Sequence, residues 1–260
     1  MKKILQIANI LALIVTLIIN YLSNSGIFNG NTMATVSARY QNYFTPAGYA
    51  FAIWGLIYMG LLAFVIYQAR GLSKKVADQW PVLEIGWWFV ISCAANSLWV
   101  FAWLYDYIGF SVVIMIILLI SLIKIIIDTR MELDDLPIKK IAFVWWPFCL
   151  YSGWITVALV ADVAAWLTKI HWDGFGISGI TWAIVMIIVA GIINLIVTWN
   201  RNMREYALVA TWALIAIAVA NWNTAQPVVN IAIVVASVLF LSSGIHAYIN
   251  RKTNPLKNLF

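Results

Sequence analysis

Charged residues are scarce in this chain of 260 residues. They make up 10% of the chain, whereas 64% of its residues are hydrophobic and the mean hydropathy is +0.92. Soluble domains carry about 25% charged residues and about 45–50% apolar ones. A soluble fold cannot bury so much apolar surface, because its surface-to-volume ratio limits burial. The composition therefore excludes a soluble domain and a disordered chain, and it indicates an integral membrane protein.

Cysteine and histidine are also few. Cys93 and Cys149 lie inside apolar runs, so no disulfide framework is indicated. His171 and His246 lie in different regions, and no group of His, Cys, Asp and Glu has metal-ligand spacing. The sequence contains no phosphate-binding loop and no recognisable Ser-His-Asp arrangement. We therefore predict no catalytic residue, no metal site and no required cofactor.

Long apolar runs dominate the chain, and the alternation typical of strands is lacking. A bilayer span needs about 20 apolar residues, and a backbone in lipid must satisfy its own hydrogen bonds. The runs that meet this requirement are 4–22, 47–69, 83–104, 109–128, 141–167, 177–199, 205–221 and 228–249. No small-x-small cleavage site follows the first run, so we expect a retained helix there. The predicted fold class is all-α, a polytopic membrane helix bundle with about eight transmembrane helices.

Lysine and arginine cluster on one side of these runs. The net charge of +6 falls in short clusters between apolar runs, which argues against nucleic acid as a partner. With a cytoplasmic N-terminus, only Arg39 and Lys169 lie outside, while Lys124 lies within the fourth run. The inner segments hold Lys2, Lys3, Arg70, Lys74, Lys75, Arg130, Lys139, Lys140, Arg201, Arg204, Arg251, Lys252 and Lys257. We therefore expect a multi-pass protein of a bacterial plasma membrane with both termini in the cytoplasm.

Tryptophan is abundant, with 15 residues. Those at the ends of the apolar runs suit the interfacial aromatic belt. Tryptophan is a poor filler inside a bundle, because its ring is large and its N–H needs a partner. The tryptophans inside the runs or near their ends are Trp54, Trp99, Trp146, Trp154 and Trp182. Two interpretations stay open, namely a pocket for a flat apolar ligand with a polar edge, and helix packing alone.

Three segments in register carry a family resemblance. The first runs from Phe44 to Tyr58 (FTPAGYAFAIWGLIY), the second is Asn96-Ser97-Leu98-Trp99, and the third begins Tyr151-Ser152-Gly153-Trp154. In their spacing and order these segments resemble the TspO/MBR family, the tryptophan-rich sensory proteins related to the mitochondrial translocator protein. The resemblance implies a five-helix core over residues 1–172. Residues 173–260 would then add three transmembrane helices and a short cytoplasmic tail.

The resemblance also implies a ligand site. Proteins of this family bind tetrapyrroles and other flat hydrophobic ligands, so a porphyrin or haem is the expected small-molecule partner beside the lipid bilayer. The expected ligand-binding residues are Pro46, Tyr49, Trp54, Tyr58, Asn96, Trp99, Tyr151, Trp154, Ala158 and Asp162. Residues three or four apart on a helix share a face, so these positions predict an aromatic cleft with a few polar groups.

The chain departs from the family pattern at several positions. Thr45 replaces the first of two prolines, Gly48 stands where the family has tryptophan, and Leu150 stands where it has proline. Asp162 replaces an asparagine, and a carboxylate inside a span is costly enough to mark function. We expect Asp162 to pair with Arg39 or to meet a cationic ligand, the alternative being a solvated carboxylate near the outer surface.

The sequence leaves several functions open. The leading hypothesis is a TspO-like protein that binds its ligand as a sensor or regulator. The alternatives are a transporter of a small hydrophobic molecule, a light-dependent porphyrin-degrading enzyme, and a membrane scaffold. Ala216 and Ala220 form a small-xxx-small pair, which favours close packing inside the bundle over a homodimer and leaves both open.

Overall fold

The computed structural model describes residues 1–73 and 80–250. These residues form helices and turns and contain no strand, which confirms the all-α prediction. Five of the cationic residues assigned above to inner segments lie outside the described residues. They are Lys74, Lys75, Arg251, Lys252 and Lys257.

Each expected apolar run contains a helix. These helices are α1 (Lys2–Leu22), α3 (Ile53–Ser73), α5 (Trp88–Leu104), α6 (Ile108–Asp128), α8 (Trp146–Lys169), α9 (Gly179–Arg201), α10 (Arg204–Asn221) and α11 (Gln226–Ile249). Within the described ranges, 6 helical segments are long and apolar enough to cross a membrane, and they include every one of these helices except α5 and α10. Helix α5 is apolar but has only 17 residues, about 26 Å at the usual rise per residue. The prediction of a polytopic helical membrane protein is confirmed.

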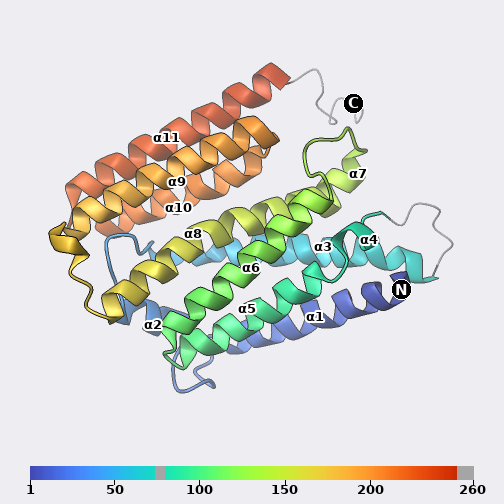
Figure 1. Cartoon of the computed structure of the whole chain (residues 1–260), viewed down its shortest axis with the longest axis horizontal. Coiled ribbons are helices and arrows are strands. Elements are labelled where there is room, and N and C mark those ends of the chain that lie inside the picture. Colours follow the sequence, from blue (N-terminus) through green and yellow to red (C-terminus); the bar gives the residue numbers. More distant parts are fainter. Residues whose placement is uncertain (74–79, 251–260) are drawn as a thin grey trace. The chain divides into compact units, whose positions relative to one another are not determined.

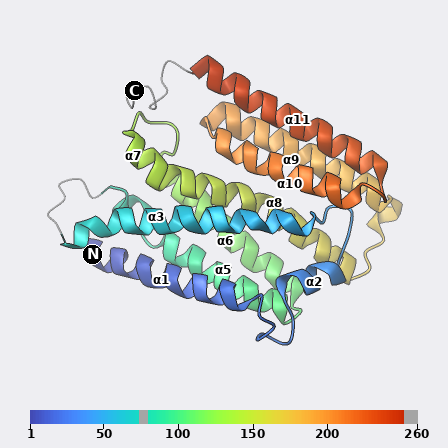
Figure 2. The same ribbon diagram turned by 180° about the vertical axis from the view of Figure 1, so that it is seen from behind.

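The chain forms two compact units. The first comprises residues 1–36 and 54–152, and the second comprises residues 37–53 and 153–260. The dividing point lies inside α8, whose first turns belong to the first unit and whose remainder belongs to the second. In the first unit, α1, α5 and α6 lie side by side (Figure 1 and Figure 2).

Two interruptions shape the helices of the first unit. The short helix α4 (Val82–Ile85) ends at Gly86, whose φ of 54° and ψ of −133° suit only glycine. The expected span 83–104 is therefore broken, and α5 begins anew at Trp88. The expected span 141–167 begins instead with α7 (Ile138–Lys140) and the π-helical turn η2 (Ile141–Trp145), which lead into α8.

A cluster of amide side chains joins α1 to α3. Gln6 Nε2 donates to the backbone oxygen of Gln68 at 2.7 Å, and Asn9 Nδ2 donates to Gln68 Oε1 at 2.9 Å. All three residues are buried. Gly71 allows this approach, because a Cβ there would lie 2.6 Å from Gln6 Nε2. The amide N–H groups of Gln6 and Asn9 thus bond α1 to α3, whereas Gln6 Oε1 and Asn9 Oδ1 are buried without a partner in the described residues.

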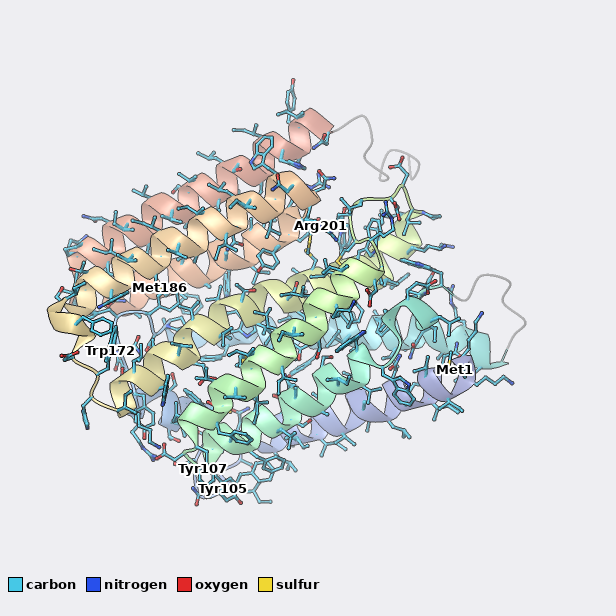
Figure 3. The ribbon with its side chains drawn as sticks, in the orientation of Figure 1. Met1, Tyr105, Tyr107, Trp172, Met186 and Arg201 are labelled. Atoms are coloured by element: carbon cyan, nitrogen blue, oxygen red, sulfur yellow. The ribbon has the colours of Figure 1, made fainter. Side chains whose placement is uncertain are left out.

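In the second unit, α9, α10 and α11 lie side by side (Figure 1 and Figure 2). Helices α9 and α11 approach closely, because a Cβ on Gly191 would lie 2.6 Å from Val235 Cγ1. Figure 3 labels Arg201 at the end of α9 and Trp172 in the turn that precedes this helix. Helix α10 also contacts α8, where the hydroxyl oxygens of Thr156 and Tyr206 lie 2.6 Å apart.

The segment that leads into α3, which we term the strap (residues 40–53), forms hydrogen bonds with α10. Asn221 Nδ2 donates to the backbone oxygen of Tyr43 at 3.0 Å. Trp212 Nε1 donates to the backbone oxygen of Ala50 at 3.1 Å. As the strap advances along the chain, its partners move backward along α10, so the two run antiparallel.

The small residues of α10 face this strap. Ala216 is fully buried, and its backbone oxygen accepts a hydrogen bond of 3.0 Å from the backbone N–H of Ala47. Close approach of a backbone requires a small side chain at that point. Ala216 therefore serves packing inside the second unit, and a homodimer stays a prediction.

Loss of the Asn221 amide should loosen the strap. In Asn221→Leu the backbone oxygen of Tyr43 loses its partner, and we expect a loss of about 1–3 kcal/mol in the free energy of unfolding. Trypsin should also cut faster after Arg39, next to the strap. Thermal unfolding and timed trypsin digestion of the detergent-purified protein measure both effects. Asn230→Leu is the control, because the Gln226–Asn230 bond is exposed; equal effects of the two substitutions would contradict the assignment.

Candidate functional site

Four expected ligand residues meet in the first unit. Trp54 and Tyr58 of α3 stack with ring centroids 5.2 Å apart and an interplanar angle of 23°. Tyr151 of α8 meets the Trp54 ring at 5.8 Å and 66°. Asn96 of α5 donates from Nδ2 to the Tyr151 hydroxyl at 3.0 Å. We term Trp54, Tyr58, Asn96 and Tyr151 the aromatic cluster.

Asn96 holds the polar side of this cluster in place. It is fully buried, and its Oδ1 accepts from Asn20 Nδ2 of α1 at 2.7 Å. Asn20 Nδ2 in turn lies 2.9 Å from the backbone oxygen of Thr16. The Asn96 amide thus connects α1, α5 and α8, and the orientation of the Tyr151 ring depends on it.

The Tyr58 hydroxyl is the unusual group of the aromatic cluster. Its oxygen is buried, yet it has no hydrogen-bond partner within residues 1–73 and 80–250. A buried hydroxyl without a partner costs about 1–3 kcal/mol. Such a group in a native protein calls for an explanation, such as a water or a ligand that accepts its proton.

Trp99 lies in a neighbouring stack. Its ring lies on that of Trp103, with centroids 5.8 Å apart and an interplanar angle of 25°. Both side chains are buried, and Trp103 Nε1 lies 3.5 Å from the backbone oxygen of Met33. Trp99 therefore packs on Trp103, one turn further along α5, and Trp103 contacts α2 (Met33–Arg39) at Met33.

The other expected ligand residues belong to the second unit. Pro46 is buried in the strap and lies two residues before η1 (Gly48–Ala52). Tyr49 is 43% exposed and meets the Trp212 ring edge-on at 5.3 Å. Trp154 of α8 is 2% exposed and meets the ring of Phe51 at 6.0 Å and 81°.

Asp162 and Ala158 continue the Trp154 face of α8. Asp162 is 2% exposed and has an interaction partner. It is therefore not a solvated carboxylate, which was the alternative that the sequence left open. The strap contacts α8 on both sides of Asp162: at Trp154, as above, and at Lys169, whose ammonium lies 5.7 Å from the centroid of the Tyr40 ring. Arg39 directly precedes Tyr40 and also has a partner, and its pairing with Asp162 stays a prediction.

Sequence reasoning missed several residues of these arrangements. Asn20, Trp212 and Asn221 provide hydrogen bonds that position expected site residues or the strap. Asn20 and Asn221 are amides at the ends of apolar runs, a signal that could have identified them. The partners of Trp212 could not be found this way, because Trp212 and Ala50 are 162 residues apart.

Metal-binding groups do not gather in the described part of the chain. No cluster of three or more His, Cys, Asp and Glu residues there could hold a metal ion. His171 lies exposed in the turn after α8, and His246 is buried in the last turns of α11.

A family model described as TSPO-like protein matches residues 6–245. The chain belongs to the TSPO-like protein family. No curated protein and no solved structure was found to match it. The family match runs through α9, α10 and nearly all of α11, so it is not confined to residues 1–172. The division of this TSPO-like protein into a five-helix core and three added helices stays a prediction.

The Asn96–Tyr151 hydrogen bond should appear as a coupling energy. We expect the double-mutant cycle of Asn96→Leu and Tyr151→Phe to show about 1 kcal/mol of coupling in the free energy of unfolding. Equilibrium unfolding in detergent measures it. The control cycle pairs Asn96→Leu with Tyr58→Phe, which removes a hydroxyl that has no partner, and its coupling should be near zero. Equal coupling in both cycles would argue against this hydrogen bond.

Proposed function

We propose that this TSPO-like membrane protein binds a flat hydrophobic ligand with a polar edge, a tetrapyrrole, against the aromatic cluster and acts as a sensor or regulator. The buried, unpartnered Tyr58 hydroxyl carries this proposal. The hydroxyl belongs to one ring of the stacked Trp54–Tyr58 pair, and a flat ligand can pack against an outer face of such a pair. The resemblance to tetrapyrrole-binding proteins supports the choice of ligand class.

The polar groups suit the edge of such a ligand. Tyr58 can donate its hydroxyl proton to a carboxylate or carbonyl oxygen. The Tyr151 oxygen accepts from Asn96, which leaves its own proton for a second acceptor on the ligand. Trp54 and Tyr58 are both half-buried, so part of each side chain is exposed, and we propose that the ligand contacts this part.

Titration with protoporphyrin IX tests this proposal. We expect saturable binding in the micromolar range, followed by porphyrin absorbance and tryptophan emission. Tyr58→Phe should keep the fold, because it removes a hydroxyl that has no protein partner, and should weaken binding about threefold to tenfold. Tyr67→Phe is the control, since Tyr67 lies further along α3 and stacks on Phe143. Absence of saturable binding, or equal affinity of Tyr58→Phe and wild type, would overturn the assignment.

Illumination of the bound porphyrin separates a sensor from the light-dependent enzyme. If the protein is a sensor or regulator, the bound porphyrin should lose its absorbance in light no faster than free porphyrin does. Accelerated loss of the spectrum that Trp54→Phe and Trp154→Phe abolish would favour the enzyme. Protein-dependent uptake into sealed vesicles would favour the transporter.

We further propose that both termini face the cytoplasm of a bacterial plasma membrane. In the first unit, Lys2 and Lys3 begin α1, Arg70 lies in the last turn of α3, and Lys139 and Lys140 lie just before α8. In the second unit, Arg201 ends α9 and Arg204 begins α10. Cations at these helix ends fit the excess of lysine and arginine in cytoplasmic loops.

Cysteine labelling tests this orientation. Ser25 and Lys3 are exposed at opposite ends of α1, and the native Cys93 and Cys149 are buried. A membrane-impermeant maleimide should label Ser25→Cys in intact bacterial cells and label Lys3→Cys only after permeabilisation. The reverse pattern would invert the topology.

A further inference from the structure

Several polar side chains are buried inside the second unit, in the last turns of α9 and α11. Figure 3 labels Arg201, the last residue of α9. Asn194 and Thr198 of α9 are 1% and 0% exposed, and Ser243 and His246 of α11 are 4% and 2% exposed. Arg204 begins α10, three residues after the end of α9, and its Nε is buried on a helix that packs against both α9 and α11. We term these residues the α9–α11 polar cluster.

The register of the helices brings the hydroxyls of this cluster together. Helices α9 and α11 touch at Gly191 and Val235 and again at Trp199, whose Nε1 donates to Ser242 Oγ at 2.9 Å. The two helices therefore run parallel. Thr198 lies two turns beyond Gly191, and Ser243 lies at the matching level on α11. The rings of Trp199 and His246 meet edge to face, with centroids 5.1 Å apart.

Several atoms of the cluster have no hydrogen-bond partner in the part of the chain that the structure describes. They are Asn194 Oδ1, Thr198 Oγ1, Ser243 Oγ and Arg204 Nε. Thr198 and Ser243 do not use the usual bond from the hydroxyl to a carbonyl one turn earlier. A single such atom is common, but several in one place are costly in a medium that cannot hydrogen-bond. Their proximity indicates a polar ligand.

The donors define the chemistry of that ligand. Arg204 offers a charged N–H, and Thr198 and Ser243 offer hydroxyl protons. Glu205 follows Arg204 in the chain, and its buried Oε2 also has no hydrogen-bond partner in the described residues. It shares a helix face with Val209, whose Cβ lies 3.3 Å from the position of a Cβ on Gly153 of α8. We propose that the α9–α11 polar cluster binds a phosphate group, carried by an anionic lipid headgroup or by free phosphate.

The experiment measures the thermal stability of the full chain in nonionic detergent. A ligand that binds the folded state raises the melting temperature with concentration. One arm adds inorganic phosphate, a second adds phosphatidylglycerol, and a third adds phosphatidylcholine. Stabilisation by phosphate identifies a free anion, and stabilisation by phosphatidylglycerol alone identifies an anionic headgroup.

Variants distinguish the cluster from other phosphate sites. Arg204→Gln and Thr198→Val should each raise the half-saturating concentration about tenfold. Without ligand, Thr198→Val should be as stable as wild type or more so, because it removes an unpartnered hydroxyl. Thr211→Val is the matched control, since that hydroxyl already bonds the backbone oxygen of Ala207 at 2.9 Å. No stabilisation in the phosphate and phosphatidylglycerol arms, or variants that respond like wild type, would overturn the proposal.

Discussion

A polar group that enters a bilayer must find its partner inside the protein, because hydrocarbon offers none. This constraint organises the first unit. The amide of Asn96 is fully buried, and it accepts from Asn20 of α1 and donates to Tyr151 of α8. The amide cluster around Gln68 does the same for α1 and α3. Apolar contacts between helices gain little against lipid, so these few hydrogen bonds help to specify which helices lie together.

The same constraint explains the strap of the second unit. Residues 40–47 of the strap precede the helical run that begins at Gly48, so their backbone groups need partners from elsewhere. Helix α10 supplies partners to the strap through Trp212, Asn221 and the backbone oxygen of Ala216. The strap carries Pro46 and Tyr49, and it contacts α8 beside Trp154. Helix α10, which the resemblance counts as an addition to the five-helix core, thereby positions two of the expected ligand residues.

Several buried atoms of the described residues do not meet this constraint, and the two ligand proposals each start from some of them. Tyr58 carries a hydroxyl without a partner and is one ring of a stacked aromatic pair, a combination that suits a flat molecule with a polar edge. The α9–α11 polar cluster places hydroxyls without partners beside a guanidinium, which suits an oxyanion. Membership of the TSPO-like family supports the first of these sites, whereas the second depends on the residues of α9, α10 and α11 alone.

The sequence by itself determined the membrane class, the positions of the long helices and the family, because apolar length and local spacing decide these properties. It also brought Trp54 and Tyr58 to one helix face, since four residues make about one turn. The break at Gly86, the bond of Asn96 to Asn20 and the attachment of the strap to α10 were decided only by the tertiary structure. The last two depend on which groups meet across distant segments of the chain, and helical periodicity carries no information about such partners. The break at Gly86 is a local backbone conformation, which the length of an apolar run does not reveal.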